Sequence, residues 1–268
     1  RPNPGEYNRG SSMHRTAVWR TFAELFSGIG AARLAFERHG FHCLRAIDND
    51  RQACRVYRSH WDDGTLSEAN IKEAEAGDFA DVGGIWSSDP CQAESLARSG
   101  RLGGERLSGE FIRIVSHVKP LWVVRENVYP GAEVAYALCG IGYRTITIAA
   151  DALPYTGQSR LRYFVVGLHS DVGMCPGEIF SDSQGDALPP ESVYSQETYA
   201  YCLTAHDRRY NPEETYVCDR GVRILTPVER ERLQGLPSGW TNGLSDHARA
   251  RLIGNALCVP LVEEFARR

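Results

Sequence analysis

The stretch TFAELFSGIGAARLAFERHG, residues 21–40, decides the fold class of this chain. Its first six residues are largely apolar and favour a β-strand, and SGIG then forms a glycine turn. The residues that follow have the apolar spacing of a helix, which Gly40 ends. A strand, a glycine turn and a helix in direct succession are typical of the first unit of an α/β fold.

The same alternation continues as far as residue 168. The predicted strands are 41–50, 82–89, 121–128, 143–152 and 160–169, and the predicted helices are 51–61 and 109–120. This order predicts a doubly wound α/β sheet, mixed but mostly parallel, which binds its ligands at the carboxyl ends of the strands.

The character of the sequence changes after this point. Residues 169–222 are rich in Ser, Asp, Pro, Tyr and Gly and show little periodicity, so we expect a small irregular lobe with short strands. A helix capped by Thr226 follows, and residues 247–268 predict a turn and one closing helix. We therefore divide the chain into a disordered tail (1–20), a main domain (21–168 plus 247–268) and a small second lobe (169–246).

Composition restricts the class of protein. The chain has 268 residues, of which 42% are hydrophobic and 24% charged, and a net charge of −4, which is typical of a soluble globular protein. No apolar stretch is long enough to span a membrane, and the N-terminal residues lack a signal core. Eight scattered cysteines without a C-x-x-C pair argue against a metal site and a disulfide framework. We expect a cytoplasmic protein without membrane contact.

The glycine turn and the strand after it suggest a cofactor site. Glycines at a strand-to-helix junction let the backbone approach a ligand, although many such turns are only tight corners. Asp48 ends the next strand about 20 residues later, where a carboxylate can bind both hydroxyls of a ribose. Asp48 on its own fits a solvated loop charge as well. The two features together favour a cofactor that contains a nucleoside.

Two strand ends carry residues suited to covalent chemistry. Cys91 follows the predicted strand 82–89, and Glu126 ends the strand 121–128, so neighbouring strands would bring thiol and carboxyl together. A thiolate beside an acid that hydrogen-bonds a ring nitrogen suits attack on an electron-poor heterocycle. Arg160 and Arg162, at alternate positions of a strand, can share one face and orient the nucleophile or grip a carbonyl or phosphate group. The simpler interpretations are a buried inert cysteine and a strand face with surface arginines.

The motifs LFSGIG, PCQ, ENV, QSRLR, RILTPVERERLQGLP and IGNALCVP, in this order, resemble those of the C5 cytosine DNA methyltransferase family. The resemblance extends from about residue 21 to residue 268 and implies a Rossmann-like class I methyltransferase fold. It also implies methyl transfer from S-adenosyl-L-methionine to C5 of a cytosine flipped out of double-stranded DNA, through a covalent Cys91 adduct at C6. From the resemblance we expect a restriction-modification enzyme in a bacterial or viral-host cytoplasm, associated with the nucleoid. We also expect the enzyme to be a monomer.

The resemblance implies roles for individual positions. Cys91 would be the nucleophile, Glu126 would hold the cytosine ring nitrogen, and Arg160 and Arg162 would anchor the target base and the active-site loop. Phe26 would lie beside the adenine and Asp48 would bind the ribose. The full implied cofactor set is Phe26, Ser27, Gly28, Ile29, Gly30, Asp48, Asn49, Asn70, Asn255, Ala256 and Leu257, and the implied DNA contacts are Gln92, Ser95, Arg98, Arg101 and Arg106.

The sequence also departs from the family pattern. Asp89 and Glu94 stand where the family usually has small, apolar or aromatic residues, which adds negative charge near Cys91. Asn70 replaces the usual Asp, and the small lobe leaves little chain for reading bases, so we expect a short or relaxed recognition sequence. Three alternatives remain open: an RNA (tRNA) cytosine methyltransferase, a catalytically silent DNA-binding homologue, and an enzyme of this fold that transfers a different group.

Overall fold

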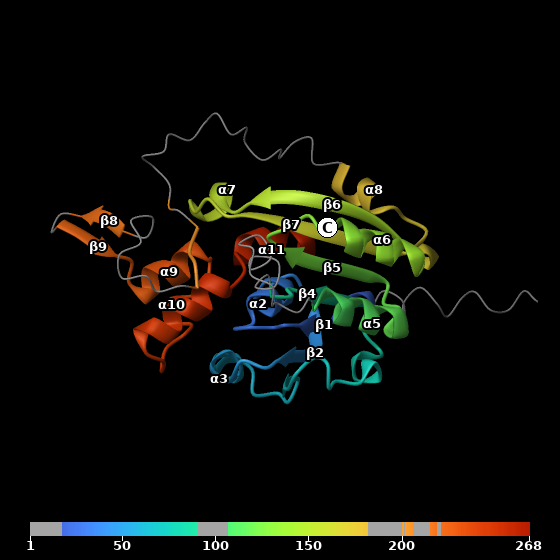
Figure 1. Cartoon of the computed structure of the whole chain (residues 1–268), viewed down its shortest axis with the longest axis horizontal. Coiled ribbons are helices and arrows are strands. Elements are labelled where there is room, and N and C mark those ends of the chain that lie inside the picture. The colour runs from blue at the N-terminus through green and yellow to red at the C-terminus, as the bar shows by residue number, and fades with distance from the viewer. Residues whose placement is uncertain (1–17, 91–106, 182–199, 201, 206–214, 219–220) are drawn as a thin grey trace, which may run out of the picture.

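The structure is a computed structural model that describes residues 18–90, 107–181, 200, 202–205, 215–218 and 221–268 (Figure 1). The segment with Cys91 and the five residues expected to contact DNA (Gln92, Ser95, Arg98, Arg101 and Arg106) lies outside these ranges, as do Glu94 and most of the expected tail. Within the described ranges, no helix is both long and apolar enough to cross a membrane.

The described residues form one large sheet of seven strands in the order β3-β2-β1-β4-β5-β7-β6. The strands are β1 (Thr21–Leu25), β2 (His42–Asp48), β3 (Leu66–Glu68), β4 (Gly84–Ser87), β5 (Trp122–Asn127), β6 (Tyr143–Asp151) and β7 (Leu161–His169). Only β7 runs antiparallel to its neighbours within this sheet. The expected doubly wound, mostly parallel α/β fold is therefore confirmed.

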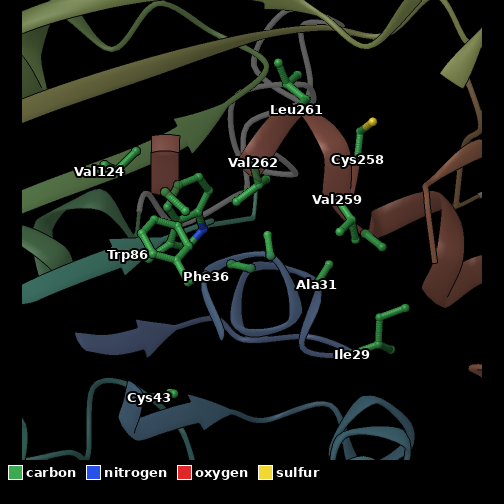
Figure 2. Close-up of a cluster of buried hydrophobic side chains, with 14 of the residues drawn as sticks. Ile29, Ala31, Phe36, Cys43, Trp86, Val124, Cys258, Val259, Leu261 and Val262 are labelled. Atoms are coloured by element: carbon green, nitrogen blue, oxygen red, sulfur yellow. The ribbon is translucent and has the colours of Figure 1, made fainter. Parts of the chain in front are cut away.

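Helices cover both faces of the sheet (Figure 1). One face packs against α2 (Ala31–Glu37), α3 (Arg51–His60) and α11 (Val259–Arg267), and the other against α5 (Ser108–Val118), α6 (Ala132–Gly140) and the 3₁₀ turn η1 (Ala76–Phe79). Because neighbouring strand residues point to opposite faces, Trp86 belongs to the first core and Ile85 to the second. Figure 2 shows Trp86 among residues of α2 and α11.

Some elements differ from the sequence expectations. β3 was not expected, because its three residues form a short edge strand with little apolar signal. The expectation of a turn followed by one closing helix is wrong, because two separate helices fill this region: α10 (Asp246–Asn255) and α11, which begins at Val259 with Pro260 in its first turn. The helix capped by Thr226 is confirmed as α9 (Pro227–Leu233), and Glu229 completes a capping box with Thr226.

Part of the region assigned to the small lobe packs on the main core. The remaining elements are α7 (Leu153–Thr156), the 3₁₀ turn η2 (Ser170–Val172), α8 (Pro176–Ser181), and a hairpin of β8 (Thr215–Cys218) and β9 (Gly221–Ile224). α8 lies against β6 and β7, and Leu236 and Trp240 are buried in the same core as α2. The described hairpin, in contrast, forms a sheet of its own.

Candidate functional site

The glycine turn after β1 has an unusual backbone conformation. Phe26, Gly28 and Gly30 have φ angles of +57°, +54° and +80°, and a side chain at residue 30 would come within 2.3 Å of the Trp61 ring. A non-glycine residue with positive φ, such as Phe26, is strained, and such strain persists where the surrounding structure holds it. The Trp240 indole contributes to that hold by donating a hydrogen bond of 3.0 Å to the carbonyl of Ile29.

Asp48, at the end of β2, is fixed against this turn. Its carboxylate accepts hydrogen bonds from the backbone N–H of Gly28 (2.7 Å) and of Asp50 (2.8 Å). Burial raises the pKa of Asp48, and these backbone hydrogen bonds oppose the rise. A carboxylate with two oxygens accepts more hydrogen bonds than these two, so it retains acceptor capacity for a ligand at the turn.

The other residues expected at the cofactor lie on three further segments. Asn49 is exposed, and Asn70 is half-buried, with its side-chain oxygen accepting a hydrogen bond from the N–H of Lys72 at 3.2 Å. Asn255 is exposed, and Ala256 is buried beside it. Leu257 lines the same small pocket as Glu126, which connects the C-terminal segment with the end of β5.

Glu126 lies at the end of β5 and is only 8% exposed. The register of β5 and β7 pairs it with Phe164, so that Arg162, two residues away, lies on the same face. The Nε of Arg162 is 3.2 Å from Oε1 of Glu126. Burial raises the pKa of the Glu126 carboxyl, while the positive charges of Arg162 and Arg160 oppose the rise. A carboxyl with a raised pKa is suited to donating a proton in a hydrogen bond.

Arg160 is buried and bound to main-chain carbonyls. Its guanidinium donates hydrogen bonds to the carbonyls of Leu203 (2.9 Å), Gly254 (3.0 Å) and Ala256 (2.9 Å). It therefore joins the start of β7 to the end of α10 and to the segment at residue 203. Its contacts are those of a side chain that shapes the pocket wall.

Cys202 is a site residue that sequence reasoning missed. Its Sγ lies 3.4 Å from a guanidinium nitrogen of Arg160 and 3.8 Å from one of Arg162. Both arginines thus approach one sulfur atom, as their alternate positions in the sequence suggest. No sequence motif pointed to Cys202, because its contact with Arg160 and Arg162 depends on how distant segments meet in the tertiary fold.

The extra negative charge expected from Asp89 is compensated in the structure. Two nitrogens of Arg125 bind the two carboxylate oxygens of Asp89, each at 2.7 Å, and both side chains are buried. The sequence showed Asp89 as an added charge but not its partner, because sequence alone does not reveal that Asp89 and Arg125 meet across β4 and β5.

The fold and the glycine turn after β1 define the chain as a Rossmann-like α/β protein, and comparison with known proteins identifies the family. The family model for C-5 cytosine-specific DNA methylase matches residues 20–199 and 191–268. The chain belongs to this family and is a DNA cytosine-5 methyltransferase. Members of the family use S-adenosyl-L-methionine as methyl donor.

Individual relatives agree with this assignment. The chain is 30% identical to Type II methyltransferase M.HgiDI of Herpetosiphon aurantiacus, with 89% of this chain and 90% of that protein covered. It is 23% identical to Type II methyltransferase M.HpaII of Haemophilus parainfluenzae, with coverage of 92% and 88%. Both relatives carry the name Type II methyltransferase.

Solved structures confirm the fold. The S. pombe Dnmt2 methyltransferase aligns with a TM-score of 0.66 at 18% identity, and 92% of this chain and 97% of that chain are covered. A putative DNA modification methyltransferase encoded within an E. coli prophage gives the same TM-score at 19% identity, with coverage of 92% and 97%.

Proposed function

We propose that this enzyme methylates C5 of a cytosine flipped out of duplex DNA, with Cys91 as the nucleophile. The observation that carries the proposal is the placement of Glu126. Its buried carboxyl lies at the end of β5, beside the end of β4, and the chain reaches Cys91 four residues after β4 ends. Arg162 on the same face supports the carboxyl.

The residues at the glycine turn fit S-adenosyl-L-methionine. Among the described residues, apart from the chain neighbours of Gly28, no atom lies within 4 Å of the position that a side chain at Gly28 would occupy, so the turn leaves room for a ligand. Asp48 would bind the ribose hydroxyls and Phe26 would lie beside the adenine. Asn49 and Asn70 would complete the adenine site. The remaining proposed contacts are Ser27, Ile29, Gly30, Asn255, Ala256 and Leu257.

The chemistry depends on activation of the cytosine ring. The Cys91 thiolate adds to C6, while the protonated Glu126 carboxyl donates its proton to N3, and the displaced electron pair makes C5 a nucleophile. When bound, the cofactor supplies an electrophilic methyl group to C5. Loss of the C5 proton to water or another base and expulsion of the thiolate then restore the ring, and the N3 proton returns to Glu126. The raised pKa of Glu126 supports its role as proton donor.

The DNA must deform for this reaction. C6 of a paired cytosine is not accessible to a thiol inside the helix, and flipping the base costs a few kcal/mol of lost stacking. We assign Gln92, Ser95, Arg98, Arg101 and Arg106 to DNA contact, and residues 169–246 to target recognition. A short or relaxed recognition sequence and a monomeric enzyme complete the proposal.

The test uses tritiated S-adenosyl-L-methionine with duplex DNA or RNA as acceptor. Wild type is expected to label DNA, Cys91→Ser to lose the label, and Cys139→Ser, at an exposed cysteine of α6, to retain it. A duplex with 5-fluorocytosine is expected to trap the wild-type enzyme covalently. Label in RNA alone would contradict the proposed substrate, and wild-type enzyme that labels DNA without being trapped would contradict the role of Cys91.

A further inference from the structure

A buried ion pair connects the two strand ends that carry the chemistry. Arg125 binds Asp89 through Nε and Nη2 at 2.7 Å each, and the two residues are 1% and 7% exposed. Two parallel N–H to carboxylate bonds fix the direction as well as the distance of the contact. A lysine at position 125 cannot reproduce this geometry, because its ammonium group is a point charge.

The two residues that flank Glu126 in the sequence both contact Asp89. Arg125 precedes Glu126, and Asn127, which follows it, donates a hydrogen bond of 3.1 Å to the backbone carbonyl of Asp89. The residues on both sides of the carboxyl thus hold the same point of the chain. Asp89 is separated from Cys91 only by Pro90, whose ring restricts the backbone.

The fold leaves space for the Arg125 side chain. A Cβ at Gly131 would lie 2.5 Å from a guanidinium nitrogen of Arg125 and 3.2 Å from Val165, so a side chain there would have to displace the Arg125 guanidinium. Ser87 pairs with Arg125 in the register of β4 and β5, which places Asp89, two residues beyond Ser87, in line with this face. The register and the close approach of Gly131 are therefore both compatible with the Arg125–Asp89 contact.

The geometry points to Arg125 and Asp89 as positioning residues for methyl transfer, an inference that rests on the proposed function. They fix the distance between the Glu126 carboxyl and the start of the segment with Cys91. Net stability does not explain such a pair, because well-packed apolar side chains replace buried ion pairs at little or no cost in many proteins. An apolar pair would lack the directional contact that fixes how Arg125 and Asp89 lie relative to one another.

The experiment separates position from stability. Arg125→Leu and Asp89→Leu each leave one buried charge unpaired, so the informative variant is the double change Asp89→Leu/Arg125→Leu, which removes both charges. We expect this variant to fold and to bind S-adenosyl-L-methionine with a Kd within twofold of wild type. Its kcat and its rate of trapping by 5-fluorocytosine are expected to fall about tenfold or more, since a misplacement of about 1 Å costs up to about 100-fold. Arg125→Lys is expected to be intermediate.

The control is a surface ion pair, 2.8 Å apart, between the exposed Arg38 at the C-terminal end of α2 and the half-buried Glu263 of α11. Arg38→Leu/Glu263→Leu is expected to keep wild-type kcat. A folded Asp89→Leu/Arg125→Leu variant with kcat within twofold of wild type would overturn the inference, as would a double variant that does not fold, since the pair is then needed for stability. Wild type that labels no nucleic acid would instead overturn the proposed function on which the inference rests.

Discussion

Glu24 gives the chain a pH-dependent stability that can be calculated from the structure. It lies in β1, directly before the glycine turn, and is 1% exposed. Its carboxyl accepts a hydrogen bond from the backbone N–H of Arg33, and its Oε2 has no hydrogen-bond partner among the described residues. Burial raises the pKa of Glu24 from 4.5 to about 8.

The sign of the effect follows from proton binding. Between pH 4.5 and about 8 the folded chain holds a proton that the unfolded chain has released, so stability is full below pH 4.5 and is lost as the pH rises. Each pH unit in this window costs about 1.4 kcal/mol. Glu24→Gln keeps the acceptor for Arg33 but does not titrate. Its free energy of unfolding relative to wild type is therefore expected to rise by about 3 kcal/mol between about pH 5 and pH 7.5.

Urea unfolding, followed by tryptophan fluorescence at steps of pH, measures this difference directly. The matched control is Glu133→Gln, at an exposed position of α6, which is expected to change with pH as wild type does. Parallel curves of stability against pH for wild type and Glu24→Gln would refute the reasoning. Such curves would mean that the pKa of Glu24 is the same in the folded and the unfolded chain.

Two further predictions concern the glycine turn after β1 and the pocket wall. The added Cβ of Gly30→Ala would lie 2.3 Å from the Trp61 ring, so this variant is expected to destabilise the chain by about 2–4 kcal/mol in urea unfolding. Gly28→Ala meets no described atom beyond its chain neighbours and is expected to cost about 1–2 kcal/mol, for its positive φ alone. Arg160→Met leaves three buried carbonyls without their donor, so we expect a loss of about 3 kcal/mol and faster hydrogen exchange around residues 254–257. Exchange at wild-type rates there would contradict the bridging role of Arg160.

The main strands were predictable because each combines an apolar run with a polar end. β5, for example, is buried at all six positions and ends in Glu126 and Asn127, and both features are visible in the sequence. β3 was not predictable in the same way, since LSE has neither length nor apolar alternation. The break between α10 and α11 had a signal in Pro260, but the helical spacing on both sides of it concealed the break.

The site shows what sequence patterns cannot determine. That Asp48 and Glu126 lie at the carboxyl ends of parallel strands follows from the order of elements, and the structure places them at the same edge of the sheet, on β2 and β5. The partners of Arg160 did not follow, because Leu203 and Gly254 are distant in the chain and reach β7 only through the tertiary fold. Charge compensation was missed for the same reason: Asp89 was recognised as an unusual charge, but Arg125 was not recognised as its partner.

The charges around Glu126 indicate that the Arg125–Asp89 pair acts on this carboxyl through its position and not through its pKa. The negative charge of Asp89 raises the pKa of Glu126 and the positive charge of Arg125 lowers it, so the two effects oppose one another. Burial and Arg162 are the larger influences on this carboxyl. Removing both members of the pair therefore leaves the charge near Glu126 almost unchanged while it removes the bidentate contact. If kcat of the double variant falls while its pH profile stays the same, the pair contributes by positioning the Glu126 carboxyl. A shifted pH profile would indicate that the pair acts through charge.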